Sequence, residues 1–408
     1  FIYYITYPNT MKNGLDAAVP PNPFNPGTPV DPNDFVGRVH ELESFRQKLR
    51  QTAEGSLASM AVAGGYGVGK TSFLHKCKAI ANEQNALTIY FSLNEIGELT
   101  RESLAKILIQ RVQEKVREEV ILKRISDNVL NALKRVKIKI EGVEISLSQE
   151  SGKEFPNLHS ALSAIWHIVK EYKSSIVFLI DEARILEKNR AEMILYLRAV
   201  LEQLQIERTP VMIVPAGKLT ISGPSGTGFS PLVRTFPPVM LENFNIDEAK
   251  GFINKKLKNA DIAIKDETIH KVYSVTEGHP FVLSSYLNSA YSLIQIGDRE
   301  LKEAHFEAAD IEFVTRTLAP FFARFYDQAG NISKQILSKM AGEDKCESSL
   351  SQLSETLKKE YNELSPHLAK LVQDGAIVRI ERGKYKLFHH LLGKYIKEKS
   401  RQHSLHSF

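Results

Sequence analysis

One glycine-rich octapeptide limits what this 408-residue chain can fold into more than any other feature. Residues 64–71, GGYGVGKT, match the pattern GxxxxGK followed by Ser or Thr, and they lie between a strand-like run at residues 56–63 and a helical pattern at residues 70–81. This order of strand, glycine-rich turn and helix is the context in which the pattern forms a phosphate-binding P-loop. The sequence therefore predicts a phosphate site at the N-terminus of a helix.

The residue types of the octapeptide match the chemistry of nucleotide phosphates. Its glycines allow the backbone to approach phosphate oxygens closely, and the following helix adds the positive end of its dipole. Lys70 supplies a cation to the β- and γ-phosphates, and Thr71 supplies a hydroxyl ligand for Mg²⁺. ATP and Mg²⁺ are therefore the expected cofactors. The nucleotide-binding residues predicted in this loop are Gly64, Gly65, Tyr66, Gly67, Val68, Gly69, Lys70, Thr71 and Ser72.

A second motif supplies a pair of carboxylates. Residues 174–183, SSIVFLIDEA, are typical of a buried strand that delivers Asp181 and Glu182 at its carboxyl end, where ligands bind to parallel α/β sheets. We expect Asp181 to hold Mg²⁺ and Glu182 to orient the attacking water, which are the roles of a Walker B pair. On its own, such a strand more often just meets solvent, but a P-loop upstream favours the catalytic interpretation.

Strand-like and helical patterns alternate through the first half of the chain. Apolar runs at residues 86–93, 176–180 and 210–216 are separated by helical patterns at residues 101–118 and 189–205. This alternation predicts an α/β fold in which a parallel sheet is covered by helices on both faces.

The other patterns predict additional regions. Alternating apolar residues at 136–147 indicate a β-hairpin insertion, and six prolines within residues 17–34 indicate an extended leader that packs on the following domain. Helical periodicity at residues 246–258, 266–276 and 280–296 predicts a small lid of about three helices.

The last part of the chain has a different pattern. Helical patterns at residues 332–340, 349–357 and 365–374 precede an alternating stretch at residues 376–388, which together predict a winged helix-turn-helix. The predicted organisation is a Pro-rich leader at residues 1–34, a P-loop ATPase core at 35–245 with the insertion at about 120–150, a helical lid at 246–317 and a winged-helix domain at 318–408.

Composition excludes several classes of protein. The hydrophobic content of 43% and the charged content of 25% are those of a globular protein, and no apolar run approaches the roughly 20 residues that span a bilayer. Cys77 and Cys346 form no metal-binding or disulfide pattern and suit a reducing compartment. We therefore expect a soluble, cytoplasmic protein without a membrane partner, with Met11 as its biological start.

The net charge of +5 is small, but its distribution is uneven. Residues 101–140 carry 11 basic and 5 acidic side chains, and residues 331–408 carry 14 and 9. The presumed recognition helix begins at Ser365 and offers few groups for reading bases, so the alternatives are a phosphate-binding surface for duplex DNA and an ordinary solvated face. The basic residues that would contact DNA phosphates are Arg379, Arg382, Lys384, Lys386, Lys394, Lys397, Lys399 and Arg401.

Five motifs in one order resemble a known family. They are FVGRVHEL at residues 35–42, the P-loop, LIDEA at 179–183, SPLVRTF at 230–236 and TEGHPF at 276–281. Together they resemble the AAA-type P-loop ATPases of the STAND and archaeal-type ATPase group, over residues 33–296 and more weakly to residue 396.

The resemblance implies roles for further residues. Phe35, Val36 and Arg38 would lie beside the base and ribose, and Pro280, in the sequence GHP, would bring the lid onto the nucleotide. Arg234 would sense the γ-phosphate, within one subunit or across a subunit interface, because a planar and permanently charged donor suits developing phosphate charge. A plain surface arginine is the alternative interpretation of Arg234.

The chain departs from this family in two places. The strand at residues 210–216 ends without the small polar residue that commonly acts as sensor 1, and leaves Lys218 or Thr220 as substitutes. The lid helix after Pro280 has no arginine where replication initiators carry sensor 2. Both departures favour slow, switch-like hydrolysis over fast turnover.

The function predicted from the sequence is an ATP-binding and ATP-hydrolysing molecular switch. The alternative is a nucleotide-gated DNA-binding module, or an assembly module like a replication initiator, with little turnover. The expected partners are ATP and ADP, with duplex DNA at the winged helix, another protein and self-assembly as further alternatives.

Overall fold

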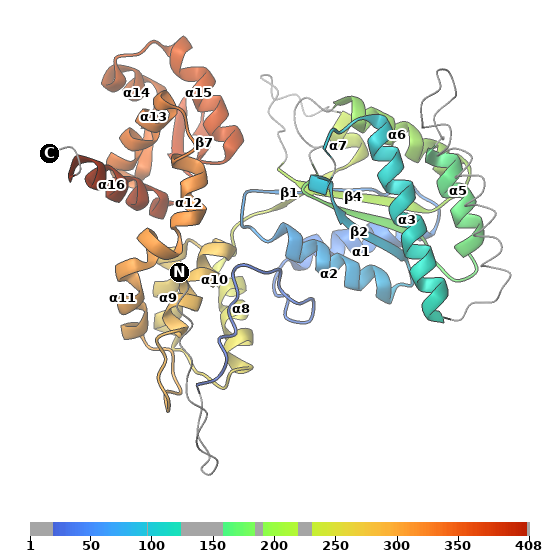
Figure 1. The fold of residues 1–408 in the computed structure, drawn as a ribbon, viewed down its shortest axis with the longest axis horizontal. Helices are drawn as coiled ribbons and strands as arrows, with labels where there is room; N and C mark the ends of the chain where they lie inside the picture. Colours follow the sequence, from blue (N-terminus) through green and yellow to red (C-terminus); the bar gives the residue numbers. More distant parts are fainter. Residues whose placement is uncertain (1–18, 96, 124–157, 184–190, 219–230, 406–408) are drawn as a thin grey trace, which may run out of the picture.

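A computed structural model describes residues 19–95, 97–123, 158–183, 191–218 and 231–405 (Figure 1). The predicted hairpin at residues 136–147 and Thr220 lie outside these ranges. Figure 1 shows two groups of elements, a sheet with its covering helices and a column formed by the remaining helices and a small sheet. No helix among the described residues has the length and apolar character needed to cross a membrane.

The larger sheet is parallel, which confirms the predicted α/β fold. Its five strands lie in the order β2-β3-β4-β1-β5, and every neighbouring pair is parallel. The sequence patterns do not indicate β5, because its four residues begin with proline and lie half-buried at the edge of the sheet. The strands are β1 (Ala61–Gly64), β2 (Leu87–Ser92), β3 (Ile176–Asp181), β4 (Val211–Gly217) and β5 (Pro238–Leu241).

Helices cover both faces of this sheet. Along β3, Phe178 and Ile180 belong to the hydrophobic cluster formed with α3, α5 and α6, whereas Val177 and Leu179 belong to the cluster formed with α1 and α2. Because successive strand residues point to opposite faces, a strand buried on both sides is apolar throughout. The helices are α1 (Val39–Ala53), α2 (Lys70–Glu83), α3 (Arg101–Lys123), α5 (Leu158–Val169), α6 (Ala191–Ile206) and α7 (Pro231–Thr235), with a short 3-10 helix at Leu93–Glu95.

The lid, residues 246–317, is helical, and its first two helices have the bounds that the sequence predicts. A capping box formed by Asn245 and Glu248 starts α8, and proline at the first position starts α10. The elements of the lid are α8 (Ile246–Lys258), α9 (Asp266–Thr276), α10 (Pro280–Tyr291), α11 (Glu303–Glu312) and a π-helical turn at Phe313–Thr317.

The C-terminal region, residues 319–405, contains the predicted three helices and hairpin together with flanking helices. Its three strands form an antiparallel sheet in the order β6-β8-β7. The elements are α12 (Ala319–Tyr326), α13 (Asn331–Gly342), a 3-10 helix at Asp344–Cys346, β6 (Glu347–Ser349), α14 (Leu350–Leu357), α15 (Tyr361–Asp374), β7 (Ile377–Glu381), β8 (Lys384–Leu387) and α16 (His390–Leu405).

The presumed recognition helix begins earlier than the sequence predicts. Helix α15 starts at Tyr361 instead of Ser365, because Glu360 and Glu363 form a capping box, in which the Glu360 N–H donates to Glu363 Oε2 at 3.0 Å. Pro366 therefore lies inside the helix, not at its start. The helix thus continues through Pro366 after a start that the Glu360 N–H and Glu363 carboxylate define.

The leader, residues 19–34, contains no helix or strand and packs between the core and the lid. The Phe24 side chain is buried in one cluster with residues of α8 and α10, and the Asn288 amide donates to the Phe24 carbonyl at 2.6 Å. On the other side, the Val30 N–H donates to Ser72 Oγ at the start of α2, at 3.1 Å. The extended leader predicted from the prolines thus contacts both parts of the molecule.

Candidate functional site

The P-loop connects the end of β1 to the start of α2 at the carboxyl edge of the sheet. Gly69 caps the helix with φ of +93°, and Gly67 has φ of +74°, a backbone conformation that side chains with a Cβ rarely adopt. Residues 65–69 therefore form a tight turn above the N-terminus of α2, whose free N–H groups suit an anion.

Lys70 points back into its own loop. Its ammonium donates to the carbonyl oxygens of Gly64 at 3.2 Å and Gly65 at 2.7 Å. Burial lowers the pKa of Lys70, and the nearby carboxylates of Glu182 and Asp181 oppose this shift. The lysine thus occupies the position from which it can reach a bound phosphate by exchanging carbonyl partners.

The two predicted magnesium ligands meet below the loop. Thr71 Oγ1 donates to Asp181 Oδ2 at 2.7 Å, although 110 residues separate them in the sequence. The Asp181 side chain is buried at the end of β3. A hydroxyl and a carboxylate are the oxygen donors that Mg²⁺ prefers, so these residues fit the expected ion.

Tyr90 joins the same carboxylate and was not predicted from the sequence. Its hydroxyl donates to Asp181 Oδ2 at 3.1 Å, from strand β2 next to β3. Burial raises the pKa of the Tyr90 phenol, and the charge of Asp181 raises it further. The available signal was a hydroxyl-bearing ring within the otherwise apolar run LTIYF, but only the pairing of β2 with β3 directs it to Asp181.

Glu182 lies where the sheet ends and the cavities begin. It has φ of +46°, an uncommon conformation for glutamate, and its N–H donates to Asp181 Oδ1 at 2.9 Å. Its side chain is exposed and lines both cavities described below. This bend separates the two neighbouring carboxylates, so that Asp181 meets Thr71 of the P-loop helix and Glu182 lines the two cavities.

A cavity of about 300 Å³, here called the nucleotide cavity, surrounds the loop. Leader residues 25–30, which the sequence did not place there, line it together with the P-loop. Of the predicted site residues, those that line the cavity are Phe35, Val36, Arg38, Tyr66, Gly67, Val68, Gly69, Lys70, Thr71, Ser72, Glu182 and Pro280. Gly64, Gly65 and Asp181 do not line it.

The lid is held directly on the P-loop by the segment that contains Pro280. His279 Nδ1 accepts from the Val282 N–H at 3.4 Å, which leaves Nε2 to donate to the Tyr66 carbonyl at 2.9 Å. The Phe281 N–H donates to the Gly67 carbonyl at 3.1 Å. A Cβ on Gly67 would lie 2.7 Å from Phe281 Cβ, so the loop and the lid are in close contact. Burial lowers the pKa of His279 to about 3 and keeps the ring neutral.

Arg38 lines the nucleotide cavity, but its polar atoms join the core to the lid. Its N–H donates to Glu248 Oε1 at 2.9 Å, and its guanidinium donates to the Glu242 carbonyl. The guanidinium also lies 5.0 Å from the centroid of the Phe244 ring. The contact with ribose that the resemblance implies remains a prediction, whereas the contacts with both sides of the core–lid connection are present.

Arg234 lies on α7, is exposed, and does not line either cavity. Its predicted role as a γ-phosphate sensor, within one subunit or across a subunit interface, remains a prediction.

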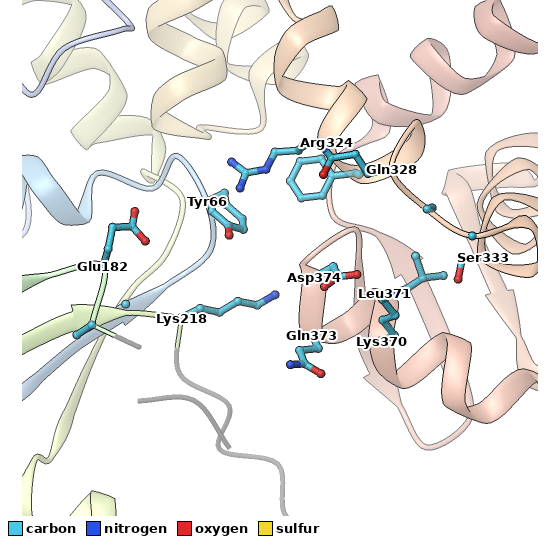
Figure 2. Close-up of a pocket in the computed structure, with 15 residues that line it drawn as sticks. Tyr66, Glu182, Lys218, Arg324, Gln328, Ser333, Lys370, Leu371, Gln373 and Asp374 are labelled. Carbon is cyan, nitrogen blue, oxygen red and sulfur yellow. The ribbon is translucent and has the colours of Figure 1, made fainter. Parts of the chain in front are cut away.

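A second cavity, of about 420 Å³, lies beside the first and separates the core from the C-terminal region (Figure 2). We call it the inter-region cavity. From the core, Tyr66, Glu182 and Lys218 line it, and from the C-terminal region Arg324 and Asp374 do so. The sequence suggested Lys218 as a substitute sensor but provided no indication of Arg324.

Glu277, His389 and His390 bring three possible metal-ligating atoms within 4.8 Å of one another. Both ring nitrogens of His389 are engaged, with the Thr276 carbonyl at 3.0 Å and the Leu391 N–H at 3.1 Å. His389 is therefore a buried hydrogen-bonding residue that joins α9 to α16.

Comparisons with known proteins agree with this geometry. A family model described as BREX system ATP-binding protein BrxC/D matches residues 34–176, which include the P-loop. A curated relative, the uncharacterized HTH-type transcriptional regulator MJ0774 of Methanocaldococcus jannaschii, is 23% identical over 394 residues, covering 89% of this chain and 88% of that protein.

Solved structures extend the comparison. The Walker-type ATPase PABY2304 of Pyrococcus abyssi superposes with a TM-score of 0.57 at 18% identity, covering 91% of this chain and 99% of that one. The RuvB Holliday junction branch migration motor of Thermotoga maritima gives a TM-score of 0.45 at 17% identity, covering 87% and 93%. The likeness to the Pyrococcus structure shows that the chain has a P-loop ATPase fold.

Proposed function

We propose that this chain binds Mg-ATP in the nucleotide cavity and hydrolyses it slowly as a molecular switch of the STAND or archaeal-type ATPase group. The observation that carries the proposal is the hydrogen bond between Thr71 and Asp181 directly beneath the P-loop. It joins the two motifs at the position where a phosphate-bound cation would sit. Glu182 opens into the same cavity.

Each residue of the site has a task in this proposal. The base lies near the apolar side chains of Phe35 and Val36, and the phosphates lie on the loop N–H groups at the start of α2. Lys70 exchanges its carbonyl partners for phosphate oxygens. Bound Mg²⁺, held by Thr71 and through water by Asp181, supplies positive charge to the β- and γ-phosphates. Glu182 orients the attacking water.

The switch arises from the contacts between the lid and the loop. His279 and Phe281 donate to carbonyls of the loop that also surrounds the phosphates, so a change of loop shape on nucleotide binding reaches the lid directly. The division into a core at 35–245, a lid at 246–317 and a winged-helix domain at 318–408 is part of this proposal.

The decisive experiment measures ATP and ADP affinity by calorimetry and phosphate release at steady state. The wild type is compared with Lys70→Ala and Glu182→Gln. We expect Lys70→Ala to abolish nucleotide binding, and Glu182→Gln to bind ATP but lose turnover. If Lys70→Ala binds both nucleotides as the wild type does, the cavity is not the nucleotide site. If turnover persists in Glu182→Gln, Glu182 does not orient the water.

A second candidate function is nucleotide-gated binding of duplex DNA by the C-terminal region. It is favoured by the three helices and hairpin of this region, and by the exposed cations Arg379 and Arg382 on and after β7. The relative from Methanocaldococcus jannaschii is named as an HTH-type transcriptional regulator, which agrees with this candidate. In this alternative, ATP occupancy changes DNA affinity while turnover stays negligible.

The two candidates are separated by adding duplex DNA to the same assays. DNA binding with a steep salt dependence, weakened in an Arg379→Gln and Arg382→Gln variant, supports the DNA-directed candidate. If DNA neither binds nor changes hydrolysis, the C-terminal region serves another partner or self-assembly.

A further inference from the structure

The inter-region cavity adjoins the nucleotide cavity. Tyr66 and Glu182 line both cavities. Figure 2 shows Glu182 and Lys218 extending from the core into this space, and Arg324 reaching across to Tyr66 from α12. A group bound beyond the tip of the P-loop would therefore meet residues of two regions.

Three positive charges surround this junction. The Arg324 guanidinium lies 3.5 Å from the centroid of the Tyr66 ring, and Lys70 Nζ lies 5.8 Å from the same centroid. Lys218 Nζ is buried and has no hydrogen-bond partner among the described residues. Burial lowers the pKa of Lys218 to about 8, and the charges of Lys70 and Arg324 contribute to this shift.

Nearby carboxylates favour the charged forms of these groups, Asp374 for Lys218 and Glu182 for Lys70, but they make no direct ion pair with them. In the part of the chain that the structure describes, neither Glu182 nor Asp374 forms an ion pair with Lys70, Lys218 or Arg324. The third carboxylate, Asp181, already accepts hydrogen bonds from Thr71 and Tyr90. A buried ammonium without a partner is costly, and an anion at this junction would relieve that cost for Lys218 while also attracting Lys70 and the exposed Arg324.

We propose that the terminal phosphate of ATP is this anion, and that Arg324, with Lys218, distinguishes ATP from ADP. This inference rests on the proposed function, since it needs the nucleotide on the P-loop. A bound γ-phosphate extends past Lys70 towards Glu182, which is the side on which Arg324 and Lys218 lie. ADP leaves that space without an anion, and the guanidinium then stays on the Tyr66 ring.

Arg324 connects the terminal phosphate site to the C-terminal region. The next residue, Phe325, lies 6.2 Å from the Tyr66 ring and 4.8 Å from Phe388 at the end of the β7–β8 hairpin, measured between ring centroids. Lys218 reaches the same region, because a Cβ on Gly375, which caps α15, would lie 3.4 Å from Lys218 Nζ. A terminal phosphate that attracts both cations therefore alters the contacts of α12 and α15 with the core.

The test measures ATP and ADP affinity by calorimetry for the wild type, Arg324→Gln and Lys218→Met. A charge-assisted hydrogen bond to phosphate leads us to expect an ATP affinity about tenfold weaker in Arg324→Gln, with ADP affinity changed less than about twofold. Lys218→Met should reduce the preference for ATP in the same direction. Arg316→Gln is the matched control, because Arg316 is an exposed arginine paired with Glu312 at 2.6 Å. It should bind both nucleotides as the wild type does.

A further variant separates phosphate binding from support of the loop. Tyr66→Leu removes the ring on which Arg324 rests but leaves the guanidinium, so the preference for ATP should persist. Equal losses of ATP and ADP affinity in Arg324→Gln would overturn the inference and assign Arg324 to loop support. An unchanged ratio of ATP affinity to ADP affinity in Arg324→Gln would also overturn the inference. If the wild type binds neither nucleotide, the proposed function fails together with this inference. If the wild type binds both nucleotides and Lys70→Ala binds neither, the proposed function stands, and the Arg324→Gln result then tests this inference alone.

Discussion

His279 Nε2 donates a hydrogen bond to the Tyr66 carbonyl over 2.9 Å, and this contact joins the N-cap of α10 to the P-loop across 213 residues of sequence. Because the ring is buried and neutral, the hydrogen bond is shielded from water. The lid therefore rests on the same loop that would surround the phosphates.

Replacing His279 by leucine is expected to destabilise this connection. The Tyr66 carbonyl and the Val282 N–H would both lose a buried partner, which costs about 1–3 kcal/mol. Urea unfolding should show this loss. The exposed His270→Leu is the control and should change the free energy of unfolding by less than about 0.5 kcal/mol. Equal stability of the two variants would contradict the assignment.

Acidification is expected to destabilise the protein. Burial lowers the pKa of His279 to about 3 and of His389 to about 4, with Glu277, His390 and Lys386 as the charged groups facing them. Below pH 6.5 the unfolded chain binds protons that the folded chain does not, so the free energy of unfolding falls by about 2 kcal/mol per histidine at pH 5.

Thermal unfolding at pH 7.5 and 5.0 checks this expectation. His279→Gln should show a smaller decrease between these two pH values than the wild type, because one of the two histidines no longer titrates. A decrease of the same size in both proteins would assign the acid sensitivity to other groups.

Replacing Tyr90 by phenylalanine is expected to weaken the use of magnesium without unfolding the protein. The variant leaves Asp181 Oδ2 with Thr71 alone, so the carboxylate is less well oriented. The Mg²⁺ concentration needed for half-maximal ATP binding should rise by about threefold to tenfold. Tyr172→Phe, at an exposed tyrosine, is the control. An unchanged magnesium requirement in Tyr90→Phe would remove Tyr90 from the site.

Gly67→Ala is expected to break the contact between loop and lid. The new methyl group would lie 2.7 Å from Phe281 Cβ and 2.8 Å from His279 Cε1, in addition to the strain of φ at +74°. Gly55→Ala separates the two effects, because Gly55 has φ of +87° but nothing within 4 Å of a Cβ. Gly55→Ala should lower the free energy of unfolding by about 1 kcal/mol. Gly67→Ala should lower it by clearly more and should also weaken nucleotide binding. If both variants lose the same free energy of unfolding, backbone strain alone explains the loss, and the contact between loop and lid contributes nothing.

The sequence predicted those parts of the fold that depend on local periodicity. Helices α8 and α9 have the predicted bounds, and the buried strands β2, β3 and β4 agree within a few residues. Strand β5 was missed because a short edge strand with proline has no apolar run. The start of α15 was misplaced because the cap at Glu360 is a stronger signal than Pro366.

The site was predictable only where a motif identifies it. The P-loop and the Asp181–Glu182 pair are local patterns with known chemistry. Only the folded chain brings Tyr90 to Asp181, and Arg324 and leader residues 25–30 to the cavities, so no spacing in the sequence predicts them. Arg38 shows the opposite case, in which a motif identifies an important residue but does not reveal that its guanidinium binds the Glu242 carbonyl.

The hydrophobic cluster that contains Phe24 continues from the lid through Leu337 of α13 to Ile396 of α16 without interruption. A shared interior of this kind couples the folding of its parts, because neither half can bury its apolar surface alone. A chain ending near residue 317 would leave α10 and the π-helical turn facing water and would tend to aggregate. The lid and the C-terminal region are thus expected to unfold in one cooperative transition, distinct from that of the parallel sheet.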